Sequence, residues 1–202
     1  MCEHCDNFVE TGELVKHKNS VIKSQKSFVN LLNVRKINLA YMKIKKLFIT
    51  ASKEKTREQW QNAQNKYVYY CNHIYENDID ALIELGEICT HLMQFKNAIN
   101  CFEKSKERQK HNPSHHIRIG ENHARKQDWK NSLQTFENLF ADETAEGKSA
   151  KAQRSLLIKC GILALNINDE NKIAEYANKL ANIGEKEIAK QIKKNKVKNK
   201  EK

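Results

Sequence analysis

Apolar residues recur along most of the chain at steps of three and four positions rather than at every second position. This spacing places them on one face of a helix, whereas alternation would indicate a strand. The clearest run predicts a long helix that ends near Glu76, with an apolar face formed by Trp60, Ala63, Tyr67, Cys71 and Ile74. Two earlier runs predict helical faces at Phe28, Leu31 and Leu32, and at Ile37, Ile44, Leu47 and Phe48. We therefore expect an all-α protein.

The middle of the chain repeats itself at an offset of 34 residues. A fixed period of this size marks a repeated structural unit, so each copy predicts one pair of helices joined by a turn. The matched positions are Gly86 with Gly120, Glu87 with Glu121, Phe95 with Trp129, Lys96 with Lys130, Asn97 with Asn131, Ala98 with Ser132, Phe102 with Phe136 and Glu103 with Glu137.

The spacing inside each copy has a steric reason. A small residue on the first helix and another on the second, twelve positions later, let two antiparallel helices approach closely, and an aromatic residue one turn further fills the space between them. These positions are Gly86, Ala98 and Phe102 in one copy, and Gly120, Ser132 and Phe136 in the next. Asp128 is a good N-cap for a helix starting at Trp129, and Asn112-Pro113-Ser114 predicts another helix start.

A degraded third copy follows. One amphipathic helix is predicted from Leu156, Leu157, Cys160, Gly161, Ala164 and Leu165, and after the turn Asn166 to Asn171 a second from Ile173, Ala174, Ala177 and Leu180. Gly161 lies 41 residues after Gly120. We therefore place seven extra residues in the polar connection Ala141 to Ala150.

These features resemble the tetratricopeptide repeat, a 34-residue helix–turn–helix unit with large–Leu–Gly, small and aromatic positions. The resemblance implies an α-solenoid of antiparallel helical hairpins, with units at about 79–112, 113–146 and 150–184 and extra N-terminal helices stacked on them as an atypical end layer. The sequence departs from the family at the usual first-helix aromatics, which are Leu82 and His116, and at the usual tyrosine, which is Cys89 or His123. The late proline of the family is missing from both good units.

In this family the first helices of successive units line a concave groove that binds other proteins. The positions that would line it here are Ile83, Glu84, Glu87, Thr90 and His91 in one unit, and Ile117, Arg118, Glu121, Ala124 and Arg125 in the next. Members that grip a chaperone C-terminal carboxylate use Lys, Asn and Arg where this chain has Ile83, Glu87, Ile117 and Glu121, so that mode is disfavoured. A partner helix or extended peptide with apolar anchors and some basic residues fits better, and a solvated face that binds nothing is the alternative.

Composition and length set the domain organisation. The chain has 202 residues, six glycines and one proline, which fits helices almost throughout one domain. We expect residues 1–12 to be disordered, residues 13–184 to form the helical-repeat domain, and residues 185–202 to form a basic tail, of which Lys193 to Lys202 is too polar to fold. The N-terminus resembles no export signal, and the most apolar run, Leu156 to Ile167, is too short to cross a bilayer. A cytoplasmic, possibly nuclear, protein is expected.

The formal charge of +11 is concentrated in two segments. The tail from Glu185 holds eight lysines and three glutamates, and the stretch Arg35 to Arg57 holds eight basic residues and one glutamate. Lys43, Lys45, Lys46 and Lys53 could contact the phosphates of RNA, with nearby Tyr41, Trp60, Tyr67, Tyr69 and Tyr70 stacking on bases. The same lysines could instead be solvated, with Trp60 and Tyr67 in the core, and the Lys, Asn and Ile excess could reflect adenine- and thymine-rich codons.

Candidate chemistry is sparse. Cys2-Glu-His-Cys5 offers half a zinc site, and its only approximate complement is Cys71 with His73, so we expect no metal and leave zinc at Cys2 and Cys5 open. Cys71, Cys89, Cys101 and Cys160 lie within helical apolar patterns and are expected to be reduced core thiols. His111, His115 and His116 are expected to be helix-start polar residues. No phosphate loop, nucleophile elbow or dinucleotide motif occurs, so we expect no cofactor and no enzyme. The favoured function is a scaffold or adaptor that binds another protein within a multi-subunit complex, and the alternative is an RNA- or ribonucleoprotein-associated factor.

Overall fold

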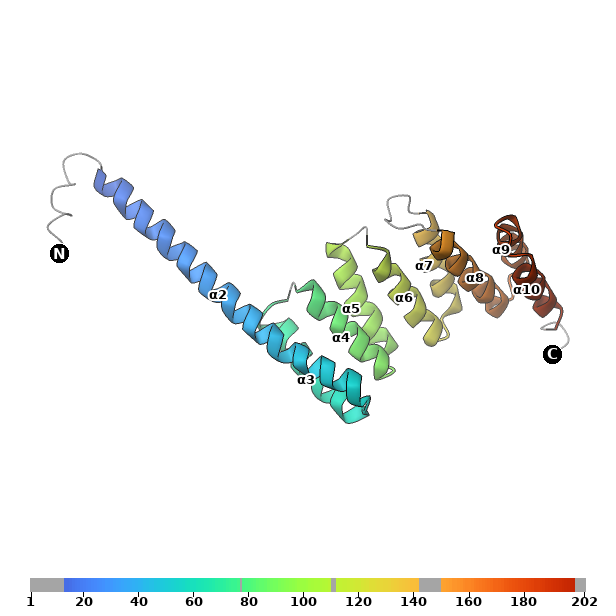
Figure 1. The fold of residues 1–202 in the computed structure, drawn as a ribbon, viewed down its shortest axis with the longest axis horizontal. Helices are drawn as coiled ribbons and strands as arrows, with labels where there is room; N and C mark the ends of the chain where they lie inside the picture. Colours follow the sequence, from blue (N-terminus) through green and yellow to red (C-terminus); the bar gives the residue numbers. More distant parts are fainter. Residues whose placement is uncertain (1–12, 77, 110–111, 142–149, 199–202) are drawn as a thin grey trace.

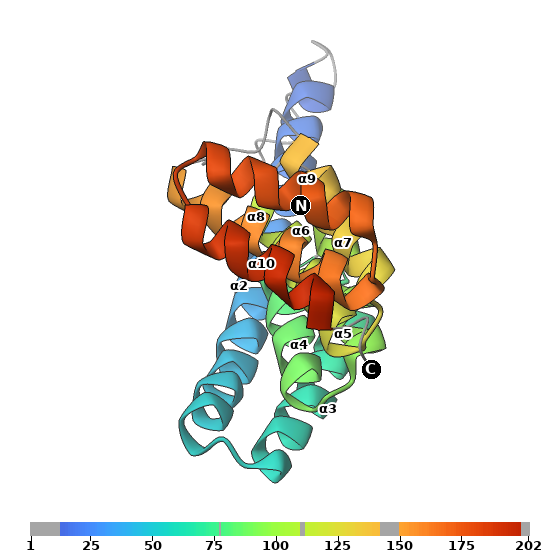
Figure 2. The same ribbon diagram turned by 90° about the vertical axis from the view of Figure 1, so that its right-hand side faces the viewer.

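The computed structural model describes residues 13–76, 78–109, 112–141 and 150–198, and all regular secondary structure in these ranges is helical (Figure 1). The helices are α2 (Glu13–Glu54), α3 (Arg57–His73), α4 (Ile79–His91), α5 (Phe95–Arg108), α6 (Pro113–Arg125), α7 (Trp129–Ala141), α8 (Ala150–Ile167), α9 (Glu170–Asn182) and α10 (Lys186–Lys198). The predicted α-solenoid is confirmed: α4 with α5, α6 with α7, and α8 with α9 form three antiparallel hairpins that pack in chain order. Viewed from its C-terminal end, the row twists, and α9 and α10 cross the direction of α2 and α3 (Figure 2).

The turn inside each hairpin repeats at the level of the backbone. Met93, Gln127 and Asn168 occupy the same position of successive units, and each has a left-handed φ, of 61°, 64° and 61°. The next residue donates its N–H to a carbonyl five residues back, from Gln94 to Cys89 (2.8 Å), Asp128 to His123 (2.9 Å) and Asp169 to Ala164 (3.1 Å). The third unit therefore keeps the turn of the first two, although its sequence has drifted.

Side-chain caps start several helices. Asn112 accepts a hydrogen bond from the Ser114 N–H (3.0 Å) with Pro113 in the first turn, as predicted. Asp169 caps α9 in the same manner through the Lys172 N–H (3.1 Å). Asp128 accepts from the backbone of Asn131, which confirms it as the cap of α7.

The predicted contact between small and aromatic residues is present in two units. Gly86 faces the ring of Phe102, and Gly120 faces the ring of Phe136. In the third unit Gly161 faces Ile192 of α10 instead, because the aromatic position has become Ala177. Helix α10 thus supplies from outside the hairpin the side chain that the unit itself lacks.

Helix α10 corrects the expectation for the C-terminal tail. Residues from 193 onward were predicted to be too polar to fold, yet the helix continues to Lys198. Ala189 and Ile192 are buried and Ile188 is half-buried against the C-terminal core, so a narrow apolar stripe holds an otherwise basic helix on α8 and α9.

The N-terminal layer consists of α3 and the C-terminal half of α2. Trp60 and Tyr67 are buried, as predicted for core residues. Helix α3 ends at His73, slightly before the predicted end near Glu76. Leu31 and Leu32 do not stack on the repeats, since they are exposed where α2 leaves the body (Figure 1).

Several expectations fall outside the described residues: the disordered segment 1–12, zinc at Cys2 and Cys5, His111, the insertion within residues 142–149, and residues 199–202. Within the described ranges, every helix is too short or too polar to span a bilayer.

Candidate functional site

A groove of about 310 Å³ lies where α4 meets α6, the first helices of two adjacent units. The ring of Phe102 from α5 contributes to its lining, and polar and charged side chains form the rest. The lining residues are Glu87, Thr90, His91, Phe102, Arg118, Glu121, Asn122 and Arg125.

A cation from the following unit reaches back into the groove wall. Arg118 donates to Glu87 and lies 5.6 Å from the centre of the Phe102 ring. Lys159 of α8 occupies the equivalent repeat position, donates to Glu121, and lies 5.6 Å from the centre of the Phe136 ring. All four charged side chains are about one third exposed, so each ion pair contributes modestly to stability. The pairs do fix the charge pattern of the groove, because they neutralise both carboxylates.

The groove is closed on one side by a buried polar contact. Thr90 donates to Asn122 Oδ1 (2.9 Å) across the unit boundary, and Asn122 Nδ2 donates to the Arg118 carbonyl (2.8 Å). Asn122 is buried, so these hydrogen bonds satisfy an amide that would otherwise be costly to desolvate. This arrangement holds α6 in register against α4.

The other side of the groove carries His91 and Arg125. His91 stacks on Trp60, with ring centroids 4.2 Å apart and planes 9° apart. Burial, followed by the nearby charge of Arg125, lowers the pKa of His91, so its imidazole is neutral at pH 7. Arg125 is exposed, and no carboxylate of the described ranges pairs with it. Arg125 is therefore the charge that this groove offers to a partner.

Six of the ten predicted groove residues meet in this groove, namely Glu87, Thr90, His91, Arg118, Glu121 and Arg125. Four lie elsewhere, and of these Ala124 packs against the C-terminal core. Ile83 packs against the N-terminal core, and Ile117 is exposed but does not line the groove. Glu84 accepts from Tyr67 Oη (2.6 Å) and Tyr41 Oη (3.1 Å), lies 3.6 Å from Lys45 Nζ, and is only 13% exposed, so it joins α4 to α2 and α3.

Sequence reasoning missed Phe102 and Asn122 as lining residues. Phe102 was assigned only to fill the space inside its hairpin, but one edge of the ring also faces the next unit. Asn122 lies at the repeat position that holds Ile88 in the first unit and Leu163 in the third. A polar residue at an otherwise apolar repeat position was the available signal.

The lysines predicted to contact a polyanion do not share one face of α2. At about 100° per residue, Lys43 and Lys45 lie on opposite sides of the helix, and Lys46 and Lys53 point between them. Lys45 is occupied by Glu84 at 3.6 Å. Lys43, Lys46 and Lys53 therefore lie within about 80° of one another on one side of α2, and Lys45 lies apart from them.

Reactive groups in the described ranges are buried or bound. Burial raises the pKa of Cys71 to about 11 and that of Cys160 to about 12, so neither thiol is a ready nucleophile. Cys89 and Cys101 contact each other across the α4–α5 hairpin, and the contact and burial raise the pKa of Cys101. His115 is buried, with Nδ1 3.1 Å from Ser105 Oγ and Nε2 3.2 Å from Gln109 Oε1. No group of three or more potential metal ligands occurs in the part of the chain that the structure describes.

The stacked hairpins and the groove between their first helices define the chain as an all-α helical-repeat protein. No family model matches it, and no curated protein matches it. Among solved structures, it is similar to the crystal structure of MamA, with 14% identity over 74% of this chain and 93% of that chain and a TM-score of 0.49.

Proposed function

We propose that the protein is a scaffold of tetratricopeptide-repeat type that binds a helix or extended peptide of another protein in the groove between α4 and α6. The observation that carries this proposal is the groove itself, where polar and charged side chains of α4 and α6 converge beside Arg125, a cation with which no carboxylate of the described ranges pairs. Convergent polar and charged groups in a groove can orient a bound peptide.

The charges favour an acidic or amide-rich segment over the basic anchors that the sequence suggested. Glu87 and Glu121 are already paired with Arg118 and Lys159, so a basic partner would have to displace a cation. A partner carboxylate could bind Arg125 without displacing another cation. The His91 imidazole beside Arg125 is neutral, so an apolar side chain could pack there without desolvating a charge. A partner segment that places a carboxylate near Arg125 fits this charge pattern.

We infer further that the protein acts by binding rather than by catalysis. The thiols of Cys71 and Cys160 are held protonated in the core, and the His115 imidazole is buried between Ser105 and Gln109. None of these groups lines the groove. These three groups therefore serve packing, whereas an active site would bring perturbed groups together in a cleft.

Affinity purification with mass spectrometry, with and without nuclease, tests the proposal. We expect one protein partner to be retained after nuclease treatment and lost when Arg125→Glu reverses the groove cation. Lys130→Glu on α7 is the matched control, because Lys130 is exposed and away from the groove. The proposal is wrong if Arg125→Glu and Lys130→Glu retain the partner equally. If nuclease abolishes capture, the RNA-associated alternative is correct instead.

A further inference from the structure

Helix α2 is attached to the body by one regular row of side chains. Ile44 and Ala51 are buried, and Ile37, Ala40 and Leu47 are partly buried against the N-terminal core. These five residues follow each other at alternating steps of three and four, the spacing of a helix that packs along one partner. The row runs along the side of α2 that faces α3 and α4.

A second row with the same spacing runs along the opposite side of α2. At about 100° per residue, its members lie roughly half a turn from the first row. They are, in chain order, Leu32, Arg35, Leu39, Met42, Lys46, Ile49 and Lys53. This outer row extends over about 30 Å at a rise of about 1.5 Å per residue.

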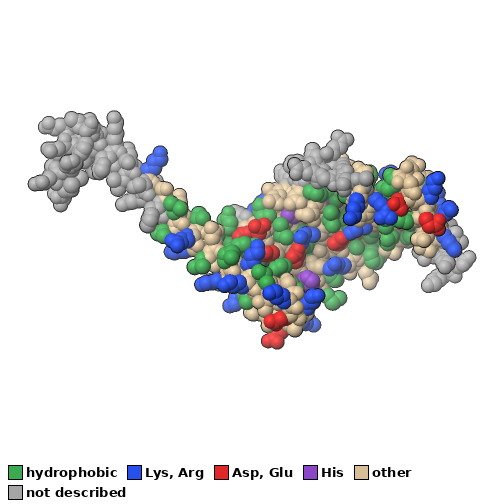
Figure 3. Space-filling model, in the orientation of Figure 1, with side chains coloured by type: hydrophobic (Ala, Val, Ile, Leu, Met, Phe, Trp, Pro, Cys, Tyr) green, Lys and Arg blue, Asp and Glu red, His purple; other side chains and the backbone are tan. Residues whose placement is uncertain are grey.

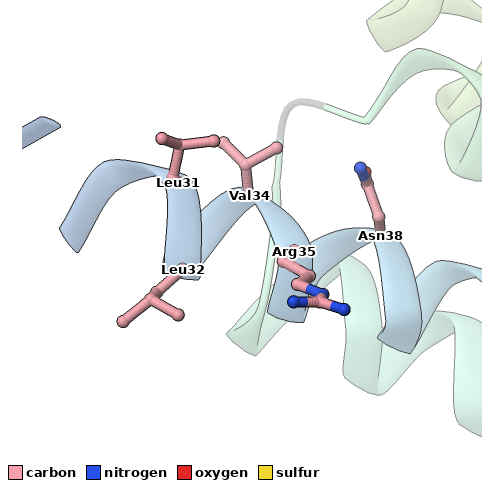
Figure 4. A pocket seen from close by; sticks show the side chains of 5 residues that line it. All are labelled: Leu31, Leu32, Val34, Arg35 and Asn38. Carbon is pink, nitrogen blue, oxygen red and sulfur yellow. The ribbon is translucent and has the colours of Figure 1, made fainter. Parts of the chain in front are cut away.

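The outer row is exposed along its whole length. Leu39 is 59% exposed and Met42 is 55% exposed, although both are large apolar residues. Hydrophobic and basic side chains lie along the part of α2 that leaves the body (Figure 3), where Leu31 and Leu32 are both exposed and point to different sides of the helix (Figure 4). Single exposed apolar residues need no explanation, but a heptad-spaced row of four is the pattern of an interface.

We propose that the outer row is the docking seam for an acidic amphipathic helix of a partner protein. In a helix pair, apolar residues of the seam pack against apolar residues of the partner, while charged positions select a partner of opposite charge. Here Arg35, Lys46 and Lys53 alternate with the apolar residues, so the partner carries Asp or Glu opposite them. This seam lies on a different side of the protein from the α4–α6 groove, and binding at one does not require binding at the other.

Charge excludes a second copy of this chain as the occupant. Residues 35–53 contain six Lys and Arg and no Asp or Glu, so two copies of α2 would bring only like charges together. Like charges along a helix pair suppress that pairing.

The placement of the cations also disfavours a membrane and RNA. An amphipathic helix that lies on a membrane keeps its cations on the polar face, whereas Arg35 and Lys46 interrupt the apolar row and would be drawn into the acyl region. Contact with RNA phosphates would leave Leu39 and Met42 without partners.

The test uses the full chain and two synthetic helices of about 28 residues, long enough to be helical. Both carry leucines at positions matching the apolar residues of the row. One has glutamate and the other lysine opposite Arg35, Lys46 and Lys53. Fluorescence anisotropy measures binding of each labelled peptide to the wild type, to Arg35→Glu/Lys46→Glu, and to the control Lys66→Glu/Lys130→Glu, whose net charge changes equally. Circular dichroism checks that each variant is folded.

We expect the wild type and the control to prefer the glutamate peptide, and the Arg35→Glu/Lys46→Glu variant to reverse that preference, with a change of about tenfold or more for each peptide. Leu39→Ser/Met42→Ser should weaken binding of the glutamate peptide. Equal binding of both peptides, or no response to charge reversal, overturns the proposal.

Three further measurements name the competing occupants. Poly(U) RNA and phosphatidylcholine vesicles containing phosphatidylserine are each tested in place of the glutamate peptide. If either one binds the wild type and Leu39→Ser/Met42→Ser abolishes that binding, the proposal is overturned. Sedimentation experiments test for self-association of the protein. If the wild type self-associates and the same variant does not, the proposal is overturned in favour of a second copy as the occupant.

Discussion

The contact between Gly86 and Phe102 gives the sharpest test of how the hairpins are held together. In Gly86→Ala, the new methyl carbon would lie 2.6 Å from Phe102 Cε1 and 2.7 Å from Cζ, well inside van der Waals contact. The ring cannot move away easily, because Phe102 is fully buried and Arg118 lies over it. Overpacking of this kind costs about 1–3 kcal/mol.

Helix propensity acts in the opposite direction. Alanine in a helix interior is more favourable than glycine by about 1 kcal/mol. If the clash falls at the middle or upper part of its range, Gly86→Ala lowers the free energy of unfolding by about 1–2 kcal/mol. Gly120→Ala should behave alike, because its methyl carbon would lie 2.7 Å from Phe136 Cζ.

Gly161→Ala is the matched control from the third unit. Its methyl carbon would lie 2.7 Å from Ile192 Cδ1, the far end of a flexible side chain on the last helix. A rotation of that side chain relieves the contact, so the propensity gain should dominate and stability should be unchanged or rise by up to about 1 kcal/mol.

Urea unfolding followed by circular dichroism measures these differences, with Phe102→Leu and the double variant completing a double-mutant cycle. Leucine removes the edge of the ring that clashes, so Gly86→Ala should cost less in the Phe102→Leu background than in the wild type. The reasoning is refuted if Gly86→Ala is at least as stable as the wild type, or if Gly86→Ala and Gly161→Ala shift the midpoint equally.

Three more predictions concern the ends and the pH response of the solenoid. Glu84→Gln should lower the free energy of unfolding by about 1–3 kcal/mol, because it weakens the acceptor of the buried Tyr67 hydroxyl. Hydrogen exchange should become faster in α2 and α3 than in α8, and a uniform increase would contradict this prediction. Burial lowers the pKa of His115 below its ordinary value of 6.5. The unfolded chain therefore binds a proton at a pH where the folded protein does not, and stability is lost as the pH falls below about 6.5. Unfolding of His115→Gln should therefore depend less on pH between about 5 and 6.5, and an unchanged slope would contradict this. A chain ending at Glu185 loses Ile192 and should melt earlier, with the loss confined to α8 and α9 by hydrogen exchange; an unchanged melting temperature would contradict it.

The hairpins could be predicted from the sequence because steric positions repeat. Gly86 and Phe102 must both be retained for two helices to approach closely, so the 34-residue echo preserves them. Hydrophobic spacing found the helices of the third unit as well, but it could not show that Ile192 replaces the missing aromatic residue. That substitution comes from a different helix and leaves no echo at a fixed offset.

The exposure of α2 and the folding of α10 could not be read from hydrophobic spacing alone. Helix α2 has two apolar rows, and the sequence does not say which one meets the body. Helix α10 has too few apolar residues to fold by its own composition, yet Ala189 and Ile192 suffice because α8 and α9 offer a surface to cover. A helix with few apolar residues is therefore stable only where a neighbouring surface packs against them.

The ion pairs between layers involve two repeat positions, one of which changes in the first unit and the other in the third. Arg118 and Lys159 hold the same position, and each pairs with a glutamate of the preceding unit. The first unit has no preceding repeat, and there the position carries Glu84, which receives Lys45 of α2 instead.

The opposite end changes in a corresponding way. The glutamate position of the first two units, Glu87 and Glu121, becomes Ile162 in the third, and this side chain is exposed. In the first two units the glutamate at this position pairs with a cation from the first helix of the next unit. The third unit is instead covered by α10, which contacts it through Ile192. The chain therefore reverses a charge at the first unit and removes one at the third, and Arg125 is the groove cation with which no carboxylate of the described ranges pairs.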